Sequence, residues 1–413
     1  MVPVFFGLMG FAIDLGQLYA MRSELKAAAN SMALAAAAKL TGTEAALDGA
    51  TAAARLTIET TSGYGNKYGF GAFPIGETTG NLSSEVSDPT YYAAVVDAIG
   101  DSSASTGGEV GGAQAKHARV TIRADAPLLF WSFLSLAQER KISLQVQSVA
   151  GQSAPLCAAC GIEPLAIAAL DSSDTVGFGL TVNQRYTLYY SCQAGGLNRP
   201  GPLGGAPLLA YLLLNRYNPN ATLYPDEQQQ AYRNGAQGMP PIPGGAWSDT
   251  LAYACVRIAT TGAGENVWAT ATPGSCGQVT PTVTSALCGL DSRFESAAPS
   301  ACSTITDVDT LLSLYTQDTD LNDLDDYTTY AGNGRRIITV PIVDALNPAG
   351  GMLVLGFREF LVEPYPGATN LTPSDQLGRF VALYIGSVVP VRQGLAGGCP
   401  QQAAGPGKVV LHQ

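Results

Sequence analysis

The first forty residues constrain the fold of this chain more than any other stretch. The run from Met1 to Ile13 carries no ionisable side chain, and Asp14 is the first such residue in the chain. From Gln17 to Leu40 the sequence has almost no helix breaker, and it consists mainly of residues that lose little entropy in a helix. The pattern predicts one long helix that is membrane-like in its first part.

The second part of this helix is predicted to be amphipathic. Apolar residues recur at a seven-residue spacing, which places them on one stripe of a helix. These residues are Phe11, Leu18, Leu25 and Met32. The charged residues Arg22, Glu24 and Lys26 fall off the stripe.

The apolar run is too short to cross a bilayer alone, since a spanning helix needs about 20 apolar residues. No Lys or Arg precedes the run, while Arg22 and Lys26 follow it. By the positive-inside rule alone, the bulk of the chain would then lie in the cytoplasm. We therefore expect a few apolar and basic residues before Met1 in the full reading frame. The alternative is a buried, Ala-rich core helix of a soluble protein.

A short motif runs through the same segment. Asp14 and Gly16 form an Asp-x-Gly step, and an Arg-x-x-Leu-x-x-Ala-Ala pattern begins at Arg22 and includes Leu25. A run of small residues follows. This motif resembles the N-terminal segment of TadG-like proteins of the Tad (Flp) pilus system. Asn30 departs from the family's pattern, because an acidic residue is usual there.

A second stretch, Val120 to Gly151, resembles the strand, proline, aromatic-rich helix and closing strand of Tad pseudopilin-like proteins. The two resemblances imply an inner-membrane helix with a periplasmic or extracellular α+β body. They also imply partners among pilus assembly proteins or pseudopilins. The residues expected to take part in these interactions are Asp14, Gly16, Arg22 and Leu25.

Asp14 carries the sharpest of these expectations. A carboxylate within hydrocarbon is costly, by about 2.5–3.5 kcal/mol at a helix centre, and this cost falls at the membrane edge. Asp14 is therefore expected either to pair with a cationic group on a partner helix or only to mark where the helix leaves the bilayer.

Composition favours an exported protein that is not an enzyme. Charged residues make up 13% of the chain, which contains 47 Gly and 25 Pro. The net charge of −11 argues against binding of nucleic acid or anionic lipid by the soluble part. The chain has only two histidines, His117 and His412, and no phosphate-binding Gly-Lys-Ser loop. These features argue against histidine-dependent hydrolysis, zinc proteolysis and nucleotide chemistry, although an enzyme built on an acidic site stays open.

All eight cysteines lie in the second part of the chain. An even number in an exported protein suggests disulfides, whose pairing the sequence does not decide. The spacing of Cys157 and Cys160 also fits a redox pair or half of a zinc site, while reduced core cysteines are the bland alternative. The candidates are Cys157, Cys160, Cys192, Cys255, Cys276, Cys288, Cys302 and Cys399.

The chain is predicted to be α+β. We expect the N-terminal membrane or amphipathic helix over residues 1–40, and a TadG or pseudopilin-like α+β region over 41–152. Over 153–413 we expect a β-rich, loop-rich, disulfide-containing exported domain. Strands are expected at Ala118–Arg123 and Ile142–Val149 because polar and apolar residues alternate there.

An acidic run in the last region is a weak calcium candidate, since Ca²⁺ prefers oxygen ligands. Its possible ligands are Asp318, Asp320, Asn322 and Asp323. The run lacks the Gly and Glu that an EF-hand loop requires, so a solvated acidic loop is the alternative. No other cofactor is expected.

The sequence thus predicts a membrane-anchored, exported component of pilus assembly with a structural or interaction role. The rival is a secreted adhesin or extracellular filament subunit that polymerises through its N-terminal helix.

Overall fold

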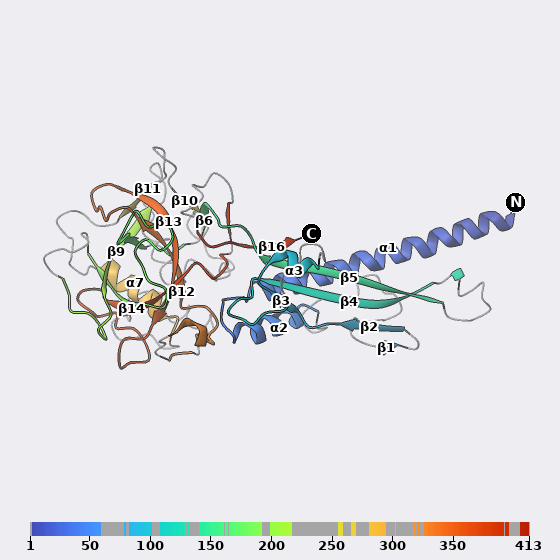
Figure 1. The fold of residues 1–413 in the computed structure, drawn as a ribbon, viewed down its shortest axis with the longest axis horizontal. Coiled ribbons are helices and arrows are strands. Elements are labelled where there is room, and N and C mark those ends of the chain that lie inside the picture. The colour runs from blue at the N-terminus through green and yellow to red at the C-terminus, as the bar shows by residue number, and fades with distance from the viewer. Residues whose placement is uncertain are drawn as a thin grey trace. The chain divides into compact units, whose positions relative to one another are not determined.

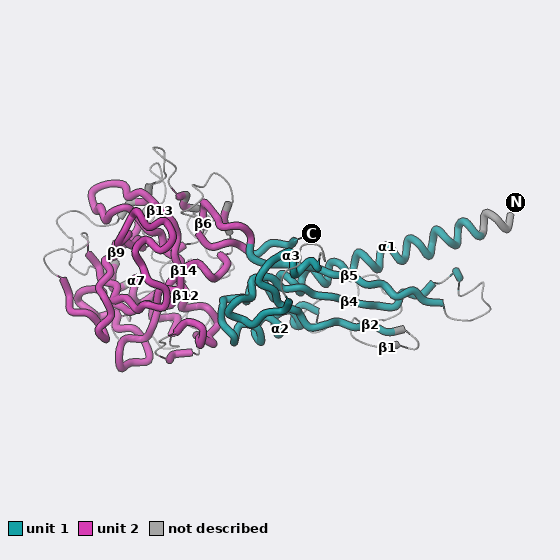
Figure 2. The backbone as a smooth tube through the Cα atoms, in the orientation of Figure 1, with its two compact units in different colours: residues 1–152, 409–413 teal, residues 153–408 magenta. Residues whose placement is uncertain are grey.

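The computed structural model describes residues 2–58, 78–79, 82–100, 108–128, 130–131, 140–160, 162–163, 165–191, 199–216, 255–258, 266–269, 281–294, 302, 317–318, 320–322, 326–391, 393–395 and 405–412. The chain divides into two compact units (Figure 2). Unit 1 is Met1–Gln152 with Val409–Gln413, and unit 2 is Ser153–Lys408. Unit 2 is thus inserted into the chain of unit 1. The division predicted from the sequence does not include the return of Val409–Gln413 to unit 1.

One long helix, α1 (Val2–Ala37), begins unit 1, as the sequence predicts (Figure 1). Its second half packs against the sheet of unit 1 through small or flexible side chains, which let the helix approach closely. The helix residues that are buried in this core are Met21, Leu25, Ala28, Ala29, Met32, Ala33, Ala36 and Ala37. A second helix, α2 (Ala46–Leu56), contributes Ala50 and Ala54 to the same core.

The unit 1 sheet is antiparallel, and its strands follow the order β1-β2-β4-β5-β16, with β3 paired to β4. The strands are β1 (Thr78–Thr79), β2 (Leu82–Val86), β3 (Thr90–Tyr92), β4 (His117–Pro127), β5 (Lys141–Gln152) and β16 (Val409–His412). A short helix, α3 (Val95–Ile99), follows β3. The two strands predicted from alternation are confirmed and lie within β4 and β5. The face toward α1 is apolar because alternate residues of β4, such as Val120 and Ile122, point into the core.

The second unit is built mainly from a 7-stranded sheet in the order β11-β13-β12-β7-β9-β8-β14. Its strands are β7 (Leu165–Ala168), β8 (Arg185–Tyr190), β9 (Leu208–Arg216), β11 (Asn266–Ala269), β12 (Ile337–Val343), β13 (Gly351–Glu363) and β14 (Phe380–Gly386). Because β14 also pairs with β13, the sheet closes on itself around an apolar core.

Three short strands, β6 (Ala158–Cys160), β10 (Cys255–Arg257) and β15 (Gln393–Leu395), form a further sheet of unit 2. The unit also contains helix α7 (Pro281–Asp291) and the 3-10 turn η2 (Tyr327–Thr329). A leading helix followed by a β-rich body with a disulfide is thus confirmed. Over the residues described, no helix combines the length and apolar character that crossing a bilayer demands.

Candidate interaction surface on the N-terminal helix

The first half of α1 exposes a row of large apolar side chains. Leu8, Met9, Phe11, Ile13 and Leu15 are each between 51% and 63% exposed. Phe11, which the seven-residue spacing places on one stripe with Leu25 and Met32, is exposed, whereas Leu25 and Met32 are buried. An ideal helix drifts by about 20° for every seven residues, so three repeats rotate Phe11 roughly 60° away from Met32. We call the exposed apolar residues between Leu8 and Leu15 the apolar α1 segment.

The inward side of the same segment is formed by Gly10 and Asp14, one turn apart. Asp14 is buried, and its carboxylate accepts hydrogen bonds from the backbone N–H groups of Phe130 (2.9 Å) and Trp131 (3.2 Å). Gly10 lies against the ring of Phe130, and a Cβ at this position would collide with a ring carbon. Phe130 and Trp131, which lie between β4 and β5 in the chain, are thereby fastened to α1. Trp131 is 51% exposed beside this contact.

The other predicted interaction residues lie in different environments. Gly16 has no atom within 4 Å of the place where a Cβ would stand, and Arg22 is exposed. Leu25 is buried in the core of unit 1. Asn30, at the position where the family usually has an acid, accepts a hydrogen bond from Ser148 Oγ at 2.7 Å. Gly16 and Arg22 are thus accessible on α1, whereas Leu25 packs in the core of unit 1. Their role in binding a partner stays a prediction.

The acidic run of unit 2 is engaged by protein groups. Asp318 is buried, forms an ion pair with Arg336 at 3.6 Å and accepts a hydrogen bond from the Tyr330 hydroxyl. Asp320 accepts hydrogen bonds from Asn322 and from the backbone N–H of Ala331. Asp323 lies outside the described residues. Among the described side chains, no group of three or more His, Cys, Asp or Glu could hold a metal ion.

Three of the eight cysteines have described side chains. Cys288 at the end of α7 forms a disulfide with Cys302, and Cys157 is also disulfide-bonded. Cys160 and Cys255 are register partners in the β6–β10 pair. Cys192, Cys276 and Cys399 lie outside the described residues. The remaining pairings stay a prediction.

Two features of unit 1 were missed by sequence reasoning. The first is the contact of His117 with His412, whose rings lie at a centroid distance of 5.1 Å. The second is a polar groove on the sheet face opposite α1, which includes Arg119 and Arg123. The alternation in β4 carried a signal for the groove, because every second residue from 119 to 123 is polar. No local sequence pattern predicts the contact between the two histidines.

Comparison with known proteins identifies the N-terminal segment. Residues 1–39 match the model of the Tad family, described as "Putative Flp pilus-assembly TadE/G-like". The match confirms the resemblance to TadG-like proteins over this segment, and it points to a role in pilus assembly and to an envelope-associated protein. No curated protein and no solved structure matches the chain. The family match falls on α1, and it includes the whole apolar α1 segment.

Proposed function

We propose that this protein is a structural component of Flp pilus assembly, anchored at the inner membrane through the first half of α1 and without catalytic activity. Units 1 and 2 would then lie on the exported side, in contact with pilus proteins or pseudopilins. The observation that carries the proposal is the exposure of the apolar α1 segment within the residues that match the family.

The exposed side chains support a binding role because contiguous apolar patches on a soluble surface mark contacts with proteins or membranes. Leu8, Phe11 and Leu15 recur at three- and four-residue spacing, so they form one stripe along the helix. Gly16 and Ala12 are exposed on the same helix. Small residues of this kind let the backbone of a second helix approach closely.

Export is supported by the disulfides. Structural disulfides persist in the periplasm and outside the cell, and they are rare in the cytosol. Cys157, Cys288 and Cys302 are all bonded in unit 2. The proposal therefore places unit 2 in an oxidising compartment.

The test replaces Leu8, Phe11 and Ile13 together by Ser in the full chain, expressed in a pilus-forming host. As a matched control, Val176 and Val182 are replaced by Ser, because both are exposed apolar residues of unit 2. We expect the α1 variant to leave the membrane fraction and to lose co-purification with pilus proteins, while the control keeps both. An α1 variant that fractionates and co-purifies like the parent would rule the proposal out.

A second candidate is a filament subunit, because the apolar α1 segment could equally pack against copies of itself. The two functions differ in what the purified protein does alone. Fibres formed by the full chain without other components, and abolished by the same three Ser substitutions, would favour the filament subunit. A monomer that binds a pilus protein through the segment would favour the assembly component.

A further inference from the structure

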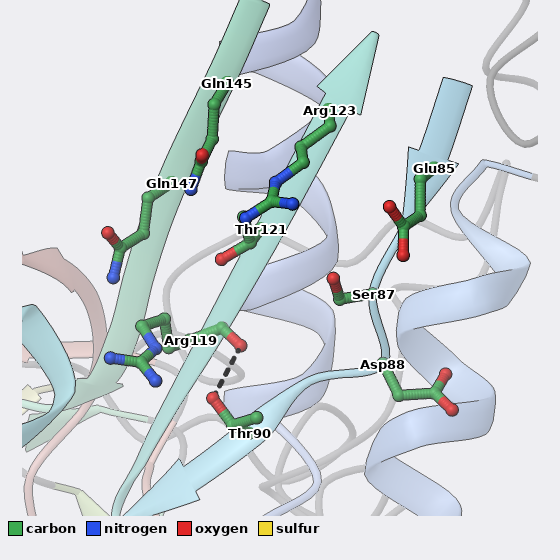
Figure 3. Close-up of a pocket in the computed structure, with 9 residues that line it drawn as sticks. All are labelled: Glu85, Ser87, Asp88, Thr90, Arg119, Thr121, Arg123, Gln145 and Gln147. Atoms are coloured by element: carbon green, nitrogen blue, oxygen red, sulfur yellow. Dashed lines mark hydrogen bonds between the residues drawn. The ribbon is translucent and has the colours of Figure 1, made fainter. Parts of the chain in front are cut away.

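The two faces of the unit 1 sheet differ in chemistry. The face toward α1 is lined by Ala118, Val120 and Ile122 of β4, which are fully buried. The opposite face carries Arg119, Thr121 and Arg123 from the same strand (Figure 3). The alternating side chains of β4 therefore give this strand one apolar and one polar face.

The polar face is hollowed into a groove of about 460 Å³. Cross-strand pairing arranges its side chains in rows. Glu85 of β2, Arg123 of β4 and Gln145 of β5 form one row, and Thr121 lies opposite Gln147 in the next. Figure 3 shows these side chains on the side of the sheet that faces away from helix α1. The groove is completed by Ser87, Asp88, Thr90 and Arg119.

The two arginines of the groove have no carboxylate partner among the described residues. Arg119 stacks its guanidinium over the ring of Tyr92 at 4.6 Å, which holds the cation in place without neutralising it. Arg123 is exposed, and although Glu85 is its register partner the two side chains form no ion pair among the described residues. Asp88, in contrast, is neutralised by a bidentate contact with Arg55. The open charges of the groove are therefore mainly positive in a chain of net charge −11.

We propose that this groove binds an extended acidic segment of another protein. Arg119 and Arg123 lie four residues apart on one strand, so their Cα atoms are about 13 Å apart at a rise of about 3.3 Å per residue. An extended peptide has the same repeat, and acidic residues at its positions i and i+4 would meet both guanidinium groups.

The remaining groove residues suit the main chain of such a segment. Gln145, Gln147 and Thr121 supply amide and hydroxyl groups at the repeat of a strand, and they can bond to peptide N–H and C=O groups. Glu85 is the one open carboxylate in the groove, and it can accept a hydrogen bond from a peptide N–H. The net charge of −11 on the whole chain would repel the same ligand away from the groove.

The test measures binding of a short fluorescent peptide to the full chain by anisotropy. The peptide carries Glu at positions i and i+4, separated by Thr and Val. We expect Arg123→Gln and Arg119→Gln each to weaken binding about fivefold, as the loss of one partly exposed ion pair predicts. The double variant should weaken binding about 25-fold, and Glu85→Gln should strengthen it. Lys39→Gln, which alters an exposed lysine just after α1, is the control and should leave binding unchanged.

Three results would overturn the inference. A peptide with Gln in place of both Glu residues could bind equally well, or the double arginine variant could bind like the parent. Alternatively, a polyuronate could bind with the same arginine dependence while the peptide does not, which would assign the groove to an acidic glycan. Arg123→Gln alters an exposed side chain, so the test does not depend on whether Arg119→Gln folds normally.

Discussion

His117 and His412, the two histidines of the chain, meet edge to face with their ring centroids 5.1 Å apart. Strand β5 lies between the strands that carry them. His117 of β4 pairs with Gly151, and His412 of β16 pairs with Val149 on the other side of β5. Within the described structure, His117 Nδ1 and His412 Nε2 are buried without a hydrogen-bond partner. Burial, aided by His412 and Lys116, lowers the pKa of His117 to about 4. Both rings are thus held neutral at pH 7.

The first prediction is that acid weakens unit 1 through His117. A histidine whose pKa is lowered on folding binds more protons in the unfolded chain, so its contribution is complete above pH 6.5 and is lost as the pH falls toward 4. Between pH 7 and about 4.5 the parent should lose roughly 1–3 kcal/mol more stability than His117→Phe, which keeps a ring but cannot titrate. Hydrogen exchange of the β16 amides at both pH values measures this. Equal losses in parent and variant would contradict the assignment.

The second prediction concerns Asp14. Asp14→Asn keeps the shape and one acceptor but removes the charge, so the contact with the N–H groups of Phe130 and Trp131 should weaken by about 1–2 kcal/mol. Trp131 fluorescence and denaturant titration report this loss. If Asp14 also pairs with a cation on a partner helix, the variant should reach the membrane normally and fail to co-purify with that partner. Normal co-purification would leave Asp14 with its internal role alone.

A pair of glycine substitutions gives the third prediction. Gly10→Ala should destabilise unit 1 by about 1–3 kcal/mol, because its Cβ would collide with the Phe130 ring. Gly16→Ala should instead stabilise the isolated protein by about 0.5–1 kcal/mol, since nothing lies near its Cβ and alanine favours a helix. Thermal unfolding followed by circular dichroism compares the two. An equal gain from both would mean that Phe130 does not pack on Gly10.

The fourth prediction contrasts two ion pairs. In unit 2, Arg293 Nη2 donates to both carboxylate oxygens of Glu163 at 3.0 and 2.9 Å, and both side chains are 2% exposed. Glu163→Gln leaves a buried cation uncompensated and should cost about 3–5 kcal/mol in the free energy of unfolding. The control is Asp88→Asn, which breaks the exposed pair with Arg55 and should cost less than about 1 kcal/mol. Denaturant titration of the full chain measures both, and similar costs would refute the distinction.

The fifth prediction concerns Glu359 of β13. Burial raises the pKa of this carboxyl to about 8, although the N–H of Val389 donates to it at 2.8 Å. The folded chain then holds a proton that the unfolded chain releases near pH 4.5, so stability falls as the pH rises from 4.5 to 8. Glu359→Gln should remove this loss and make unit 2 more stable than the parent at pH 8, with little difference at pH 5. Denaturant midpoints of the parent and of Glu359→Gln at pH 5 and pH 8 test this prediction. If the two proteins change in stability with pH by the same amount, the prediction is wrong.

Local pattern was enough to predict α1, β4 and β5. The helix formers from Gln17 to Leu40 and the alternation around Val120 each act within one element, so they can be read without knowledge of the fold. The phase of the first half of α1 could not be read in this way. Asp14 and Gly10 face inward because Phe130 and Trp131 lie against them, and that contact joins residues more than a hundred positions apart.

The candidate site was therefore predicted in part. Asp14 and Gly16 were selected by motif, whereas Phe130, Trp131 and the histidine pair depend on pairings between distant segments. The return of β16 to β5 has no sequence signal of its own, since Val409–His412 is only four residues long. The position of β16 is set by its pairing with β5, in which Val409 lies opposite Gln152.

That return also sets an order on biosynthesis. The ribosome makes β5 first, then the whole of Ser153–Lys408, and only afterwards the strand that borders β5. At about 5–20 residues per second, the edge of β5 is left open for on the order of tens of seconds. During that interval the nascent chain exposes unpaired backbone groups, which other strands can join. A chain truncated anywhere in unit 2 would keep that open edge permanently, so only translation beyond Lys408 can close it.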